Sequence, residues 1–151
     1  MIEWIGWAVW HLIVSGFSTL GFAILFQVPP KYSFWCAVTG AVGWLTYQLI
    51  MLTGAGPAVS SLIAVIPLTL LCRFFSIWCK TPTTVFLFTG IFPLVPGAGI
   101  YYTAYHFIMS ETELFFSKGM ETFKVAIAMA VGIAITLSVP IPGLPNTAKR
   151  H

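Results

Sequence analysis

The chain has 151 residues, and only 7% of them are Asp, Glu, Lys or Arg, against about a quarter in soluble proteins. Hydrophobic residues make up 58% and the mean hydropathy is +0.93, so most side chains must face lipid rather than one buried core. This excludes disordered, collagen-like and disulfide-scaffold proteins. The net charge of +3 is too small and scattered for a nucleic-acid binder. We therefore expect an integral membrane protein.

The cysteines and the N-terminus do not indicate a disulfide-stabilised, metal-binding or secreted protein. Cys36, Cys72 and Cys79 lie in or beside apolar runs, form no CxxC pair and have no histidine at ligand spacing. We interpret them as small buried side chains, and expect no disulfide framework, metal site or cofactor. The first apolar stretch is longer than a signal-peptide core and is preceded by Glu3 instead of a basic run. We expect it to remain as a span.

Five stretches are nearly free of charge, and each is close to the roughly 20 residues that a spanning helix needs. They cover residues 5–28, 34–52, 59–78, 83–109 and 125–141. Proline, glycine and lysine mark the first three connections, whereas the fourth, residues 110–124, is rich in charge. No stretch shows the ten-residue alternation of a barrel strand. The pattern predicts an all-α, polytopic transmembrane helix bundle in which residues 1–151 form a single domain.

The basic residues predict the orientation, because cytoplasmic loops carry an excess of Lys and Arg. An odd number of spans places on one face Lys31, Arg73, Lys80, Lys149 and Arg150. The other face receives only Lys118 and Lys124, together with all four glutamates. We therefore expect the N-terminus outside and the C-terminus in the cytoplasm.

Small residues at helical spacing predict close helix contacts. Gly40 and Gly43 lie in the second span, and Ala126, Ala130 and Ala134 form a stripe on the fifth. The spans should therefore form a packed bundle, which is also the size of one half of a larger transporter.

The fourth span is too long for one straight helix. Its 27 residues would extend about 40 Å, against a hydrocarbon core of about 30 Å. Pro93 and Pro96 at its centre have no N–H to donate, while Gly97 and Gly99 permit close approach of a ligand or a second chain. We predict a break at this point.

A break at mid-membrane is tolerated only inside protein or beside a water-filled cavity. A half-helix that begins near Gly97 presents free N–H groups and a positive dipole end, which suit a carboxylate. The predicted substrate-binding residues are Pro93, Pro96, Gly97, Ala98 and Gly99, with Tyr101 and Tyr102 on the following turn. The alternative is a proline kink packed against a neighbouring helix.

Other polar side chains are candidates for coupling or entry. His106 shares a helix face with Tyr102 and is one of two histidines within the spans that could assist proton coupling. Arg73 and Lys80 lie near the inner end of the third span, where they either reach the lipid headgroups or attract an anionic substrate. No span contains a carboxylate and the chain has no Asp, which argues against hydrolytic or metal-dependent enzymes.

The segments around the break resemble a known family. Residues 81–87 (TPTTVFL), 90–97 (GIFPLVPG) and 100–101 are similar to the signature of the threonine/serine exporter family (ThrE-like), and specifically to its small YjjB-like subunit. Residues 21–29 (GFAILFQVP) and 40–44 (GAVGW) resemble that family's first two spans. The resemblance covers most of the chain, but Thr89 stands where a proline is expected and Gln27 where Asn is usual.

The resemblance implies a fold, a partner and an activity. Such proteins have ten spans in one chain or split between two, and this sequence is similar to the five-span C-terminal half. It implies a larger YjjP-like membrane subunit and export of small carboxylate metabolites across the bacterial inner membrane: threonine and serine, or succinate in split members. The alternatives are a non-transporting assembly subunit and a small homo-oligomeric channel.

Overall fold

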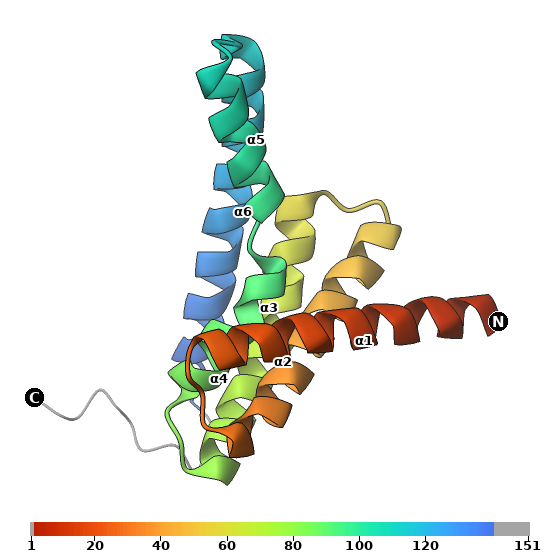
Figure 1. The fold of residues 1–151 in the computed structure, drawn as a ribbon, viewed down its shortest axis with the longest axis vertical. Helices are drawn as coiled ribbons and strands as arrows, with labels where there is room; N and C mark the ends of the chain where they lie inside the picture. The colour runs from red at the N-terminus through yellow and green to blue at the C-terminus, as the bar shows by residue number, and fades with distance from the viewer. Residues whose placement is uncertain (1, 141–151) are drawn as a thin grey trace, which may run out of the picture.

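The computed structural model describes residues 2–140, with side chains from residue 5 onward, and every regular element in this part is a helix (Figure 1). The predicted ends of the fifth span and of the tail, at Ile141, Lys149 and Arg150, lie outside the described residues. The elements are α1 (Ile2–Leu25), α2 (Pro30–Leu52), α3 (Pro57–Cys79), α4 (Thr83–Ile91), the short 3₁₀ turn η1 (Phe92–Leu94), α5 (Gly97–Ile108) and α6 (Thr112–Ser138).

Four helices are long and apolar enough to cross a membrane: Ile5–Leu25, Pro30–Leu52, Pro57–Cys79 and Thr112–Ser138. The bent pair Thr83–Leu94 and Gly97–Ile108 makes a fifth crossing if it counts as one span. The all-helical fold is thus confirmed for the described part of the chain, which has four candidate membrane spans, or five with the bent pair. Prolines set the starts of two of these helices, because their missing N–H costs nothing in the first turn: Pro30 and Pro57 open α2 and α3.

The predicted charged connection is wrong, because residues 112–124 continue the last span as one 27-residue helix. Lys118, Glu121 and Lys124 are all exposed on α6, where an (i, i+3) pair of opposite charge supports a helix. Charge in this segment therefore marks a solvated helix face and not a loop. The helix ends at Ser138, two residues before Pro140, since proline disfavours helical backbone in the residue before it.

Glycines let the helices approach one another closely. A Cβ atom added to Gly40 would lie 2.0 Å from Thr19 Oγ1 of α1, and one added to Gly43 would lie 2.5 Å from Leu68 of α3. The predicted role of Gly40 and Gly43 is confirmed. On α6 the close contact is made by Gly132, whose added Cβ would lie 2.4 Å from Val65.

The alanine stripe is not buried against this chain's own helices. Ala126, Ala130 and Ala134 are exposed, whereas the buried residues of α6 are Val125, Met129, Gly132 and Thr136. The predicted packing stripe on the fifth span is therefore wrong within the described chain. One β-carbon per residue is enough to prevent the backbone contact that Gly132 makes with α3.

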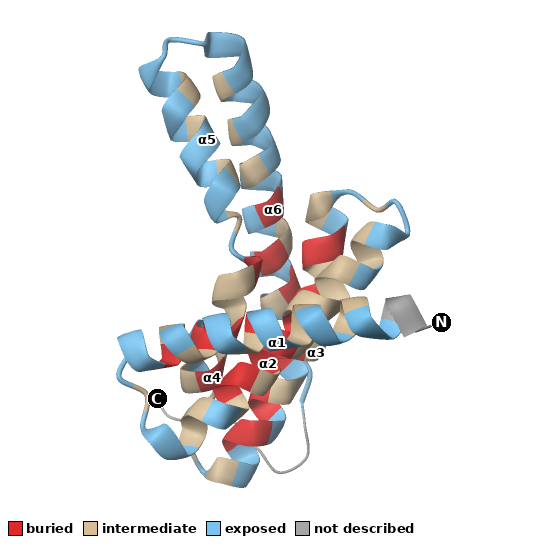
Figure 2. Cartoon of the chain, turned by 45° about the vertical axis from the view of Figure 1, so that its right-hand side comes forward, coloured by how far each residue is buried: buried red, intermediate tan, exposed pale blue. Residues whose placement is uncertain are grey.

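The molecule has two parts (Figures 1 and 2). We call α1 to α4 with residues 125–138 of α6 the bundle; its centre includes Ala64, Leu68, Cys72 and Phe86, none of them exposed. We call residues 97–124 the hairpin; here α5 packs mainly against α6 and has no buried residue. Figure 2 shows this hairpin projecting beyond the α2–α3 turn.

Candidate functional site

The chain is interrupted between α4 and α5, whose axes meet at 56°. Pro93 lies within η1 and Pro96 directly precedes α5, so neither donates a hydrogen bond that would continue the helix. Val95 is extended, with φ −58° and ψ 129°, and its N–H bonds to the carbonyls of Ile91 and Phe92 at 3.2 Å. The predicted break in residues 83–109 is confirmed.

Helix α5 begins with an open N-terminus. Pro96 makes no side-chain capping bond, and the N–H of Gly97 donates to Val95 O at 2.7 Å. The amides of Ala98 and Gly99 precede any helical carbonyl that could accept from them. Because the helix dipole places its positive end here, this terminus suits an anionic group.

A cavity of about 390 Å³ lies at this helix end, within the ~300–1,000 Å³ typical of small-ligand sites. Its walls come from four parts of the chain: Trp44 and Tyr47 of α2; Pro57 and Ser61 of α3; residues 93–99 with Tyr102; and Lys118, Glu121, Thr122 and Val125 of α6. Of the predicted substrate-binding residues, the cavity brings together Pro93, Pro96, Gly97, Ala98, Gly99 and Tyr102.

The two glycines at the break do different things. A Cβ atom added to Gly97 would meet nothing within 4 Å, whereas one added to Gly99 would lie 2.4 Å from Thr122 Oγ1. Thr122 in turn donates to Lys118 O at 2.8 Å. Gly99 therefore lets α5 rest against α6, and Gly97 leaves open space at its own position in the cavity wall.

A charged pair completes the cavity wall. Lys118 Nζ lies 3.3 Å from Glu121 Oε2, and both side chains are about half exposed, at 46% and 51%. Sequence reasoning assigned this segment to a loop and missed the pair. The sequence does contain a signal for this helix face. Lys118, Glu121, Val125 and Met129 are three or four residues apart, which is the spacing of side chains on one face of a helix, and Val125 and Met129 are buried residues of α6.

Ser61 was also missed. It is completely buried, lines the cavity, and its hydroxyl has no hydrogen-bond partner among the described residues. Its neighbour Ser60, by contrast, donates to Gly56 O at 3.1 Å. Since buried hydroxyls nearly always have a partner, the hydroxyl of Ser61 is an unsatisfied polar group in the wall of the cavity.

Tyr101 and His106 lie away from the cavity. Tyr101 is 64% exposed and stacks with Tyr105, with ring centroids 6.4 Å apart. His106 pairs its Nδ1 with Glu111 Oε2 at 2.5 Å, at the α5–α6 turn. Of the two predicted tyrosines only Tyr102 reaches the site, because adjacent residues on a helix point about 100° apart.

Arg73 does not reach toward lipid headgroups, so that interpretation is wrong for it. It is 5% exposed and donates from Nη1 to Thr136 O at 2.5 Å. That carbonyl has no helical donor because Pro140, four residues on, lacks an N–H. Arg73 thus stabilises the negative end of α6. Lys80 is exposed at the end of α3, with φ 49°.

The break can be located relative to α2 and α3. Pro57, the first residue of α3, lines the cavity, and Ser61 is one turn further on. Gly90, two residues before the break, lies against Thr39 at the middle of α2, so the break lies between the middle of the bundle and its α2–α3 end.

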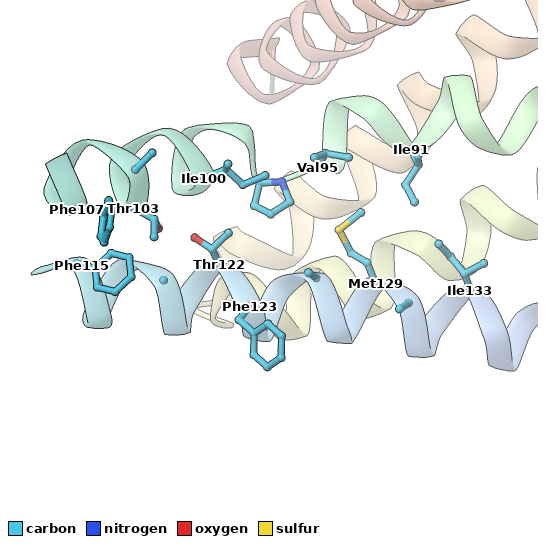
Figure 3. A pocket seen from close by; sticks show the side chains of 15 residues that line it. Ile91, Val95, Ile100, Thr103, Phe107, Phe115, Thr122, Phe123, Met129 and Ile133 are labelled. Atoms are coloured by element: carbon cyan, nitrogen blue, oxygen red, sulfur yellow. The ribbon is translucent and has the colours of Figure 1, made fainter. Parts of the chain in front are cut away.

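A second hollow lies on the other side of the break. This apolar groove of about 850 Å³ runs between α4–α5 and α6, and includes Ala126 and Ala130 of the alanine stripe. Figure 3 shows Phe107 and Phe115 at one end and Ile91 and Ile133 at the other. Its two hydroxyls, on Thr103 and Thr122, donate to helix carbonyls. With no charged side chain in its lining, this groove is unsuited to a carboxylate.

These features define a class: a polytopic helical membrane protein with a discontinuous helix and, at the break, a largely apolar cavity whose wall carries Ser61, Lys118 and Glu121. Discontinuous helices commonly hold small substrates in membrane transporters. In residues 2–140 no three His, Cys, Asp or Glu side chains lie where they could hold a metal ion. A family model described as "Threonine/Serine exporter, ThrE" matches residues 11–139. The chain belongs to this exporter family, whose members are transporters. No solved structure matches it.

Proposed function

We propose that this chain is one subunit of a secondary exporter that moves small carboxylate metabolites, threonine/serine-type amino acids or succinate-type dicarboxylates, out across the bacterial inner membrane. One observation carries the proposal: the uncapped N-terminus of α5 opens onto a cavity that also contains Lys118. Membership in the threonine/serine exporter family supports the direction of transport and the presence of a carboxylate on the cargo.

Binding follows from the geometry. A carboxylate at the α5 terminus accepts hydrogen bonds from the amides of Ala98 and Gly99, and the dipole and Lys118 balance its charge. The open space in front of Gly97 admits the substrate. Transport then requires the site to be exposed to each side of the membrane in turn, by movement against a partner half.

Gly97→Leu tests the site. The new side chain projects into empty space, so the fold tolerates it, but it fills the room in front of the amides. Gly21→Leu is the matched control, since an added Cβ there also meets nothing within 4 Å and Gly21 does not line the cavity. Efflux of labelled serine, threonine and succinate from vesicles should be lost with Gly97→Leu and retained with Gly21→Leu.

The test separates the proposal from its rivals. Unchanged efflux with Gly97→Leu would contradict the site and favour the alternative in which this chain is a non-transporting assembly subunit. Loss of efflux with an intact complex, measured by copurification, supports the site.

We further propose that a larger, YjjP-like five-span subunit covers the hairpin. Helix α5 has no residue buried by this chain, and exposed apolar side chains such as Ile100, Phe107 and Ile108 cover it. Copurification in mild detergent should bring down a second membrane protein. Copies of this chain alone would instead indicate a homo-oligomeric channel.

The proposed orientation has the N-terminus outside and the C-terminus in the cytoplasm. In Figure 1 the α1–α2 and α3–α4 connections, with Lys31 and Lys80 beside them, lie toward the same end of the bundle. This grouping of basic residues is expected of a cytoplasmic face. Labelling an introduced cysteine at exposed Thr53, on the α2–α3 turn, with an impermeant reagent from outside intact cells tests it.

A further inference from the structure

We propose that Glu121 and Ser61 make the cavity selective for a hydroxylated, zwitterionic amino acid over a dicarboxylate. Glu121 binds the ammonium group and Ser61 the side-chain hydroxyl, while the α5 terminus and Lys118 hold the carboxylate. This inference rests on the proposed function and assigns the groups that choose among its substrates.

The charges in the cavity wall favour a zwitterion over a dianion. The cavity lining contains one cation, Lys118, and one anion, Glu121, besides the positive end of α5. A zwitterion matches both signs, whereas a dianion brings a second carboxylate into a cavity that holds Glu121. Like charges at close range disfavour binding, and partial shielding from water strengthens the effect.

The ion pair between Lys118 and Glu121 is weak enough for a bound substrate to separate the two side chains. Both residues lie on α6 at (i, i+3) spacing, and each side chain is about half exposed, so their mutual attraction is weak. A bound amino acid replaces one intrahelical pair by two, with its carboxylate on Lys118 and its ammonium on Glu121.

The buried hydroxyl of Ser61 favours a substrate that carries a hydroxyl group. Its hydroxyl is the one side-chain group of the described cavity wall that is both fully buried and without a hydrogen-bond partner. Trp44 is not free in the same way, because its Nε1 donates to His11 Nδ1 at 3.2 Å. A substrate hydroxyl can satisfy Ser61, whereas an alanine methyl group leaves it unpaired.

The test compares efflux of serine, threonine, alanine and succinate from membrane vesicles of cells that produce the whole transporter. Glu121→Gln should lower serine and threonine efflux by about tenfold or more, and should leave succinate efflux unchanged or raise it. Glu113→Gln is the matched control, because Glu113 is exposed on the same helix and does not line the cavity. Glu121→Asp, which keeps the charge, should restore part of the amino-acid efflux.

Ser61→Ala should reduce the preference for serine over alanine by about tenfold without lowering alanine efflux. The variant removes an unpartnered buried hydroxyl, so the protein should fold at least as well as the natural one.

The outcomes distinguish the two proposals. If Glu121→Gln lowers efflux of all four substrates equally, or Ser61→Ala leaves the serine preference intact, the selectivity inference is overturned while a blocking Gly97→Leu variant still supports the carboxylate site. If Gly97→Leu itself transports normally, the site is wrong and selectivity falls with it. Efflux of succinate but not of serine or threonine by the natural protein would also overturn the inference.

Discussion

The bundle and the hairpin are both rich in apolar side chains, yet only the bundle encloses them. In the bundle, Gly40 and Gly43 bring helices into contact with Thr19 and Leu68, and Phe86 is completely buried. In the hairpin no residue of α5 is buried. The cavity lies at the border between the two parts. A self-contained scaffold thus holds one wall of the site, while the other wall belongs to a segment whose outer faces this chain leaves uncovered.

The largest expected effect lies in the bundle. Gly40→Ala places a Cβ atom 2.0 Å from Thr19 Oγ1, and Thr19 is completely buried, so α1 and α2 must separate. We expect a loss of about 3 kcal/mol of unfolding free energy, measured by tryptophan fluorescence during denaturation in detergent. The control is Gly16→Ala at the same α1–α2 interface, where the added Cβ lies 4.0 Å from Ala41 Cβ. Equal stability of the two variants would contradict the close contact.

The next effect tests how the bundle holds α6. Arg73→Met leaves the Thr136 carbonyl without its donor and should cost about 2 kcal/mol. The control, Lys80→Met, removes an exposed cation near the same end of α3 and should change stability by less than about 0.5 kcal/mol. If instead both variants slow efflux alike and neither lowers stability, the two residues act together in attracting substrate.

A smaller effect is expected where the hairpin meets the site. Gly99→Ala directs a methyl group at Thr122 Oγ1, which is the end of a short side chain on an exposed helix, so the two helices can shift apart at about 1–2 kcal/mol. The shift moves the amides of α5 away from Lys118 and should reduce serine efflux. Adding Thr122→Ala to Gly99→Ala should restore part of the stability and part of the serine efflux. An unrescued double variant would show that Gly99 acts through something other than this contact.

The smallest effect concerns the end of α1. Gln27 has φ 54°, and the bonds Val28 N to Ala23 O at 2.9 Å and Gln27 N to Ile24 O at 3.0 Å form a Schellman motif, whose left-handed residue is usually Gly or Asn. Gln27→Gly should raise the unfolding free energy by about 1 kcal/mol. Gln48→Gly, within α2, should lower it by a similar amount. A lower unfolding free energy with Gln27→Gly as well as with Gln48→Gly would contradict the Schellman motif.

Local chemistry made the spans and the break predictable. Long apolar stretches between prolines determine α2 and α3 to within a few residues, because the starts follow the chemistry of Pro30 and Pro57. The same holds for the break, since Pro93 and Pro96 cannot donate N–H groups wherever they lie. Six of the seven predicted substrate-binding residues therefore line one cavity; Tyr101 does not, because the direction of a side chain depends on how α5 is rotated against α6.

What the sequence determined by itself is the membrane class, the helical spans and the interruption at residues 93–99, all of which depend on hydropathy and on backbone groups within a few residues. Tertiary structure decided which side chains meet at that interruption. Lys118, Glu121 and Ser61 reach the cavity from helices that are distant in sequence, and Arg73 is buried because Thr136 of α6 packs against it. Such contacts arise from the angles at which helices pack, and those angles follow from many small residues across the whole bundle together.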